Sequence, residues 1–135
     1  MDKISAKARS DLMSRVRTRD TKPELEVRRL LHSMGYRFST HKKELPGTPD
    51  IYLKKHSKVI QVFGCFWHGH ECRKGTLPKT RQDFWRQKIE RNVKRDKDSL
   101  AALNKKGLKT LIVWECELAD RDQLKERIAN FMKAN

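Results

Sequence analysis

Residues 49–72 read PDIYLKKHSKVIQVFGCFWHGHEC, and this stretch decides both the expected fold and most of the expected chemistry. Its first half holds two short apolar runs, residues 50–53 and 58–63, on either side of a turn-forming KKHS. Short β-forming runs separated by such a turn predict a β-hairpin. Its second half places two cysteines and two histidines within the eight residues Cys65–Cys72. The predicted hairpin therefore leads directly into a candidate metal site.

The sequence before the hairpin predicts mainly helical structure. Residues 21–24, TKPE, form a capping-box pattern with proline in the first turn, and the helix that they open should end at Gly35. Its apolar face is expected to comprise Val27, Leu30, Leu31 and Met34. We also expect a short basic helix over residues 5–19 and a strand over residues 36–39.

The sequence after the Cys/His segment predicts two more helices and one strand. A helix should run from a cap at Thr80 to about Lys105, and its inward stripe would comprise Trp85, Ile89, Val93, Leu100 and Leu103. Residues 110–114, TLIVW, are a continuous apolar run, which is typical of a central strand covered on both faces. A last helix over residues 121–133 would turn Leu124, Ile128 and Phe131 inward. These elements favour an α/β fold, a sheet flanked by helices, in a single domain spanning residues 1–135.

The charge of the chain points to a polyanionic partner. Its 135 residues include 32 Lys and Arg against 17 Asp and Glu, a formal net charge of +15. Residues 73–97 alone hold ten basic and three acidic side chains. Enzymes that act on small metabolites rarely need such an excess, whereas proteins that bind DNA or RNA do.

The same sequence favours a cytoplasmic protein without a membrane segment. No run approaches the roughly 18 apolar residues of a membrane span, and the first ten residues, MDKISAKARS, lack the apolar core of a secretion signal. Three cysteines cannot form a closed disulfide framework, so we expect reduced thiols.

The thiols and imidazoles are the densest chemistry in the chain. Zinc prefers four nitrogen or sulfur ligands in a tetrahedron, and Cys116, just after the apolar run 110–114, could join the two cysteines of residues 65–72. Three thiols then leave one position, for which His68 and His70 both compete. The alternative is that the cysteines are small buried hydrophobic residues.

Two acids and an aromatic pair complete the set of candidates. Asp50 follows Pro49 at the start of the hairpin, where a carboxylate can hold Mg²⁺ beside a phosphate, although Pro-Asp is also a common turn dipeptide. Asp96 falls on the inward stripe of the long helix and needs a partner, either an arginine or a catalytic histidine whose tautomer it fixes. Phe66 and Trp67 suit either a wedge between DNA bases or core packing.

Five stretches together resemble the very-short-patch repair endonucleases, which act at T:G mismatches in DNA. The matching residues are 13–21 (MSRVRTRDT), 45–50 (LPGTPD), 64–72 (GCFWHGHEC), 84–96 (FWRQKIERNVKRD) and 111–118 (LIVWECEL). They follow the order of the family over nearly the whole chain, and GCFWHGHEC with a downstream VWEC is highly specific.

The resemblance implies a restriction-endonuclease-like fold of the PD-(D/E)xK type, a three-layer core with a central mixed sheet flanked by helices and a structural zinc. It implies Mg²⁺-dependent hydrolysis of one strand, 5′ of the thymine in T:G mismatches that arise when 5-methylcytosine deaminates. It further implies a monomer that acts on double-stranded DNA with MutL- and MutS-type mismatch-repair proteins, in a bacterial-type cytoplasm at the nucleoid.

The resemblance also assigns functions to individual residues. Asp50 and the main-chain carbonyl of Val62 would bind the catalytic Mg²⁺, His68 would be the general base with Asp96 behind it, and Glu24 would be an acid linked to the active site. Zinc would be held by Cys65, His70, Cys72 and Cys116. The DNA contacts would be the groove-entering side chains Met13, Phe66 and Trp67, with Trp85 beside them, and the mismatch-reading side chains Lys88 and Asn92.

One position departs from the family pattern. Family members usually carry a histidine near the scissile phosphate where this chain has Phe63, and phenylalanine can neither donate a hydrogen bond nor carry charge. Gln61 stands near where related nucleases carry an acid and could compensate in part. Two alternatives therefore stay open: a nuclease of the same fold that cuts another lesion or site, and a DNA-binding homologue with weakened catalysis.

Overall fold

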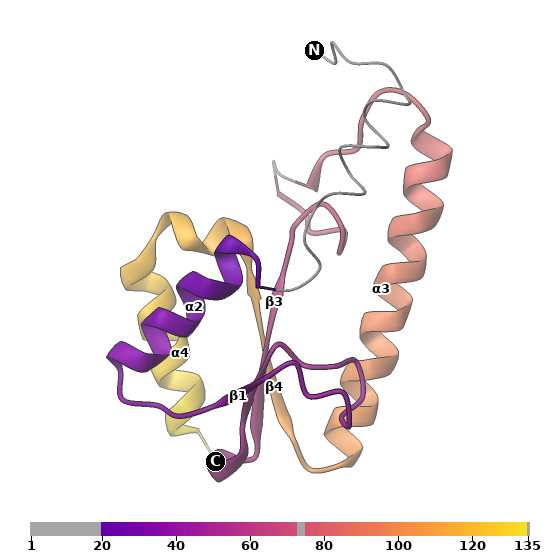
Figure 1. Ribbon diagram of the computed structural model, residues 1–135. Coiled ribbons are helices and arrows are strands. Elements are labelled where there is room, and N and C mark those ends of the chain that lie inside the picture. The colour runs from indigo at the N-terminus through magenta and orange to yellow at the C-terminus, as the bar shows by residue number, and fades with distance from the viewer. Residues whose placement is uncertain (1–19, 73–74, 135) are drawn as a thin grey trace.

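The computed structural model describes residues 20–72 and 75–134, which form a sheet with helices on both faces (Figure 1). The elements are α2 (Lys22–Ser33), β1 (Ser39–Thr40), β2 (Ile51–Leu53), the 3₁₀ turn η1 (Lys54–His56), β3 (Lys58–Phe63), α3 (Gln82–Lys105), β4 (Lys109–Trp114), the 3₁₀ turn η3 (Glu115–Ala119) and α4 (Arg121–Lys133). The helix expected over residues 5–19, with Met13, lies outside the described residues. None of the helices in the described part is long and apolar enough to cross a membrane.

The sheet is mixed, with strand order β1-β2-β3-β4. The predicted hairpin is confirmed, because β2 and β3 pair antiparallel with Ile51 opposite Ile60. The parallel pairing of β3 with β4 places Ile60 opposite Leu111 and Phe63 opposite Trp114. The parallel pairing therefore joins the hairpin to a strand that comes much later in the chain.

Helices cover the two faces of the sheet unequally. Helices α2 and α4 lie together on one face and the long α3 lies on the other (Figure 1). The larger core cluster joins α2 and α4 to the sheet through Val27, Leu31, Ile51, Leu53, Ile60, Leu111, Val113, Leu124, Ile128 and Met132. The smaller cluster, on the α3 face, comprises Val59, Leu103 and Leu108, with Leu45 and Tyr52 packed against them. The buried apolar cluster on the α3 face is therefore smaller than that on the opposite face.

Strand β4 corrects one expectation. Its apolar run predicted a central strand, but β4 is an edge strand of the described sheet, and its buried residues alternate with half-buried ones. The run is apolar because helices cover both of its faces. Its open edge is protected by Arg127, whose guanidinium donates to the Ile112 carbonyl at 2.9 Å, and a charged side chain on an edge prevents further strand pairing.

Several boundaries and orientations also differ from expectation. The strand predicted over residues 36–39 is the shorter β1, and α3 begins at Gln82 after a left-handed Arg81 (φ 55°), not at a Thr80 cap. Leu100 is 39% exposed although it falls on the expected inward stripe. From α4, Met132 is buried in the core, and Phe131 is partly buried and packs against it. In each case tertiary contacts decide which neighbouring residue is covered.

The segment 45–49 lies close against α3. A Cβ on Gly47 would lie 2.7 Å from the Ser99 Cβ, and Gly47 has a φ of +73°. Only glycine tolerates both the contact and the left-handed backbone. This contact sets the position of the loop that leads into β2.

We expect Gly47→Ala to destabilise the fold more than Gly35→Ala does. Both glycines have positive φ, but a Cβ on Gly35 would meet nothing within 4 Å. Gly35→Ala should therefore cost about 1 kcal/mol from backbone strain alone, and Gly47→Ala should cost at least twice as much because a clash is added. Denaturant unfolding of the two variants measures the difference, and equal losses would show that the loop is not held against α3.

Candidate functional site

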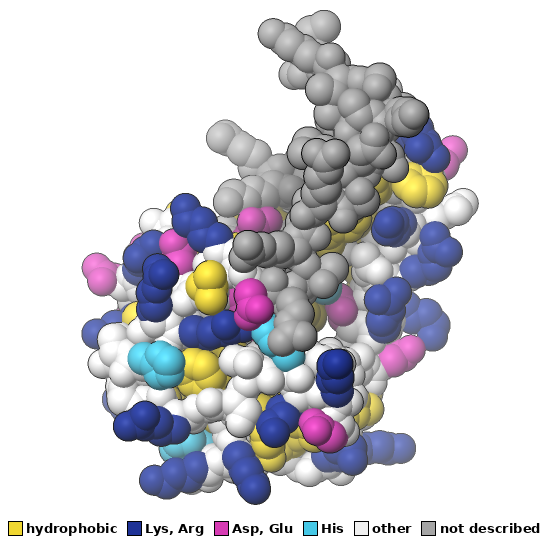
Figure 2. Space-filling view, in the orientation of Figure 1, with side chains coloured by type: hydrophobic (Ala, Val, Ile, Leu, Met, Phe, Trp, Pro, Cys, Tyr) yellow, Lys and Arg dark blue, Asp and Glu magenta, His cyan; other side chains and the backbone are white. Residues whose placement is uncertain are grey.

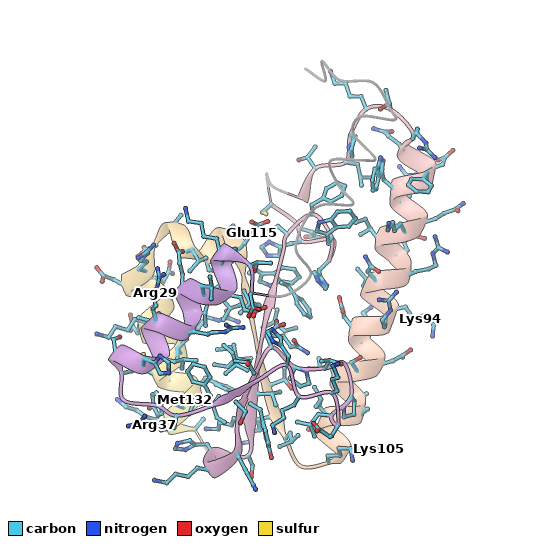
Figure 3. All side chains as sticks on the ribbon, viewed as in Figure 1. Arg29, Arg37, Lys94, Lys105, Glu115 and Met132 are labelled. Carbon is cyan, nitrogen blue, oxygen red and sulfur yellow. The ribbon has the colours of Figure 1, made fainter. Side chains whose placement is uncertain are left out.

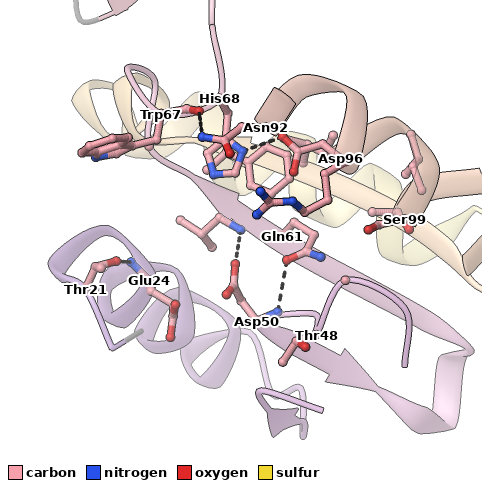
Figure 4. A pocket seen from close by; sticks show the side chains of 18 of the residues that line it. Thr21, Glu24, Thr48, Asp50, Gln61, Trp67, His68, Asn92, Asp96 and Ser99 are labelled. Atoms are coloured by element: carbon pink, nitrogen blue, oxygen red, sulfur yellow. Dashed lines mark hydrogen bonds and ion pairs between the residues drawn. The ribbon is translucent and has the colours of Figure 1, made fainter. Parts of the chain in front are cut away.

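Asp50 immediately precedes β2, and its carboxylate faces the neighbouring strand β3. Its carboxylate accepts a hydrogen bond from the Val62 N–H at 2.7 Å, and its own N–H donates to the side-chain oxygen of the buried Gln61 at 3.2 Å (Figure 4). The antiparallel register of β2 and β3 brings these groups together. Gln61 therefore orients the backbone of Asp50, a function that its position in the sequence did not indicate.

The charge of Asp50 is poorly compensated. The pKa of Asp50 is raised to about 7, mainly by burial and also by the nearby Glu24 carboxylate, while the Val62 N–H and Arg28 lower it. A buried carboxylate with a raised pKa gains stability when a cation binds. The site therefore favours a divalent metal at Asp50.

Glu24 is the centre of a second polar cluster, at the start of α2. It is only 2% exposed, and it is held by the Arg28 guanidinium and by His41, whose Nε2 lies 2.8 Å from the carboxylate. Thr21 caps the helix as predicted, but the Glu24 carboxylate accepts from the N–H of Asp20 at 3.1 Å and not from that of Thr21. The sequence analysis did not identify Arg28 and His41 as partners of Glu24. The spacing of Glu24 and Arg28, one helical turn apart, could have indicated that ion pair.

His68 and Asp96 form a hydrogen-bonded pair. His68 Nδ1 lies 2.6 Å from Asp96 Oδ2. Of the two partners expected for this acid, an arginine or a histidine, the structure therefore shows the histidine. The pairing depends on Gly69 (φ +66°), where a Cβ would lie 2.9 Å from Ile89 Cγ2 on α3. The loop after β3 thus packs directly on α3 and reaches Asp96.

A cavity of about 920 Å³ lies between the sheet and α3, and it unites these groups. Glu24, Asp50, His68 and Asp96 all line it, although they come from α2, the start of β2, the loop after β3, and α3. Figure 4 shows Asp50 on one wall of the cavity and the His68–Asp96 pair on the other. The four acid and base residues expected from the sequence therefore share one solvent-accessible space.

The aromatic and polar candidates for DNA binding that the structure describes gather in and beside this cavity. Phe66, Trp67 and Trp85 pack edge to face with ring centroids 5.1–6.0 Å apart, and Trp85 is 7% exposed, so it supports the other two. The Lys88 ammonium lies 5.4 Å from the Trp67 ring. The Asn92 side chain donates to the Trp67 carbonyl at 3.0 Å and holds this loop.

Basic side chains cover the outside of the molecule. Figure 2 shows Lys and Arg on both sides of the visible face, and Figure 3 shows that they come from α2 and its following turn as well as from α3. Arg29, Arg37, Lys94 and Lys105 are all exposed. This distribution suits a long polyanion that contacts both sides of the cavity.

The four expected soft ligands form a separate cluster. One ligand atom each of Cys65, His70, Cys72 and Cys116 lies within 4.8 Å of the others, and Cys116 Sγ is 3.6 Å from His70 Nδ1. A tetrahedral zinc with thiolate and imidazole ligands has edges of about 3.5–3.8 Å, so the spacing fits such an ion. His68 is outside the cluster, and the geometry thus selects His70 between the two histidines.

Two cysteines of this cluster have raised pKa values. Burial raises the pKa of Cys65 to about 12 and also raises the pKa of Cys116, so a metal that replaces the proton would favour the thiolate form. Three thiols and one imidazole make a soft donor set that suits zinc better than Mg²⁺. Around Asp50 the donors are instead oxygen atoms, the carboxylate and the adjacent Val62 main chain, which suit Mg²⁺.

The fold and this site define a class of protein, the DNA endonucleases. The structure resembles the catalytic domain of the homing endonuclease I-Bth0305I, with a TM-score of 0.59 and 28% sequence identity over 83% of this chain and 94% of that chain. The restriction-endonuclease-like α/β fold expected from the sequence is confirmed, with its mixed sheet flanked by helices.

Sequence comparison then specifies the family. Residues 1–74 match the family model of the DNA mismatch endonuclease Vsr. The chain is 50% identical over 131 residues to the type II nicking enzyme V.XorIIP of Xanthomonas oryzae pv. oryzae, covering 97% of this chain and 96% of that protein. It is 41% identical over 116 residues to the DNA mismatch endonuclease Vsr of Escherichia coli, covering 86% and 74%. The chain therefore belongs to the Vsr family of DNA endonucleases.

The raised pKa of Asp50 predicts a pH-dependent stability cost. The Asp50 carboxyl ionises near pH 4 in the unfolded chain but near pH 7 in the folded chain. Between these two values the folded chain binds the proton more tightly, so the free energy of unfolding falls as pH rises from about 4 to 7. Asp50→Asn, without divalent metal, should raise the free energy of unfolding by roughly 1–4 kcal/mol at pH 8 and by progressively less toward pH 5.

Chemical denaturation between pH 5 and 8 measures this dependence. Asp98→Asn is the matched control, because Asp98 is an exposed acid on α3 whose one ion pair within the described residues is with Lys94 at 3.2 Å. It should leave stability almost unchanged at every pH. A pH-independent effect of Asp50→Asn would contradict the burial argument.

Proposed function

We propose that this endonuclease nicks one strand of double-stranded DNA on the 5′ side of the thymine in a T:G mismatch, with Mg²⁺ as catalytic and zinc as structural metal. One observation carries the proposal: the half-buried Asp50 carboxylate and a histidine–carboxylate pair face each other across one cavity, in a chain of net charge +15. That arrangement provides a metal ligand and a proton acceptor on opposite sides of a space that can receive a phosphodiester.

The residues of the cavity divide the chemistry between them. Asp50 and the Val62 carbonyl would hold Mg²⁺, which when bound polarises the phosphate and lowers the pKa of water. Asp96 accepts the Nδ1 proton of His68 and so leaves Nε2 as the basic nitrogen. His68 Nε2 then takes the proton of the attacking water while the P–O bond to the leaving oxygen breaks.

Glu24 contributes charge and position. Its carboxylate lies close enough to Asp50 to raise the pKa of that group, so the two acids together make a strongly cation-attracting wall. Arg28 and His41 hold Glu24 in place and limit the repulsion. We infer that these two residues tune the affinity of the site for Mg²⁺.

Recognition of the mismatch would fall to the groups beside the cavity. Phe66 and Trp67 form a rigid aromatic wedge on Trp85, which suits insertion between base steps. Lys88 and Asn92 line the cavity and would meet the exposed bases, and Met13 would enter from the other groove. MutL- and MutS-type proteins, and a location at the bacterial nucleoid, belong to the same proposal.

The decisive experiment compares a T:G duplex with matched T:A and C:G duplexes, each with Mg²⁺ and with EDTA. We expect a nick only in the T:G duplex and only with Mg²⁺, and zinc content is measured after the EDTA treatment. Equal cleavage of all three duplexes would favour a nuclease of other specificity. Tight binding without cleavage would favour a weakened homologue.

Alanine substitution of the two histidines should produce different defects. His68→Ala should retain zinc and melt near the wild-type temperature, but its single-turnover nicking should fall by about 10²-fold or more. His70→Ala should bind zinc weakly and melt lower, because a structural metal contributes directly to folding. Zinc per chain, melting temperature and nicking rate are measured for both. The opposite pattern would reverse the assignment of the pair.

A further inference from the structure

Four aromatic rings form a continuous packed row between the cavity and the Cys/His cluster. The Phe63 ring stacks on the His68 imidazole, with centroids 3.8 Å apart and planes 4° from parallel. Trp114 meets Phe63 edge to face at 5.5 Å and stacks on His70 at 4.1 Å. The parallel register that sets Phe63 opposite Trp114 makes this row possible.

We propose that Phe63 is a positioning residue that holds the His68 imidazole in its working orientation, with Trp114 as its support. The inference rests on the proposed function of His68 as general base. It gives Phe63 a function of its own, whereas its sequence position indicated only a missing hydrogen-bond donor.

The imidazole needs a second constraint besides Asp96. A single hydrogen bond at Nδ1 fixes one atom of the ring and leaves the ring free to tilt about that bond. The His68 side chain is 25% exposed, so core packing does not restrain it. A flat contact with another ring removes the remaining freedom, because tilting would break the stack.

Phe63 is itself well held. It is only 9% exposed at the end of the buried strand β3, and Trp114 packs against it from the neighbouring strand. Trp114 in turn lies on the imidazole of His70, one of the four residues of the Cys/His cluster. An ordered cluster therefore supports the row of rings that ends at His68.

Phe63→Leu tests the proposal, since it keeps an apolar side chain but removes the flat face. Single-turnover nicking at saturating DNA and Mg²⁺ should fall roughly 3- to 10-fold, with DNA affinity and zinc content unchanged. Phe63→Tyr retains the ring and should restore the rate. Phe38→Leu is the matched control, because Phe38 stacks on His32 at 4.6 Å, outside the cavity, and its loss should leave nicking unchanged.

A double variant shows whether Phe63 acts through His68. In a His68→Ala background, Phe63→Leu should cause no further loss, because residues that act as a unit are not additive. The same fold-loss in both backgrounds would overturn the proposal, because it would show an effect independent of the imidazole.

NMR of the side-chain rings tests the stack without any activity. Phe63→Leu should move the His68 ring signals downfield, because protons over a ring face are shielded. If Phe63→Leu does not fold, His68→Ala serves instead: it should shift the labelled Phe63 ring signals and leave those of Phe38 unchanged. Unmoved signals would overturn the stack. If His68→Ala nicks normally while the signals move, the proposed function of His68 fails and the stack stands.

Discussion

The pairing of β3 on both sides is the constraint on which the rest of the site depends. Its antiparallel neighbour β2 brings Asp50 within 2.7 Å of the Val62 N–H, and its parallel neighbour β4 sets Trp114 opposite Phe63. The loop that leaves β3 and the turn that leaves β4 therefore start side by side, which is how Cys65 and Cys116 meet. A shift of one residue in either register would turn these side chains to opposite faces of the sheet.

Helix α3 supplies the other wall and limits what can approach it. Gly47 and Gly69 let two loops lie directly on this helix, and Asp96 then reaches His68 across the interface. The apolar cluster on this face is the smaller of the two, and polar groups line the cavity beside it. The same packing that opens the cavity thus also orients its acids and its imidazole.

The two candidate metal sites differ in the chemistry of their donor atoms. At Asp50 a buried oxygen ligand is held close to another acid, which raises its pKa and favours a hard divalent cation. At the Cys/His cluster, burial raises the pKa of Cys65, and the sulfur and nitrogen donors suit a soft ion. A row of packed rings, from His70 through Trp114 and Phe63 to His68, connects the two regions.

The sequence by itself determined the hairpin, the helices α2, α3 and α4, and the identity of most chemical groups, because these follow from local periodicity, turn residues and the close spacing of Cys65–Cys72. Residue spacing alone left His68 and His70 equivalent, whereas the packing of the loop on α3 separated them. Only the tertiary structure decided that β4 lies at an edge of the described sheet and that Leu100 is exposed. It also decided that Arg28 and His41 hold Glu24. The stacking of Phe63 on His68 likewise became visible only in the structure. Each of these depends on which surfaces meet across the sheet, and no periodicity within a single segment contains that information.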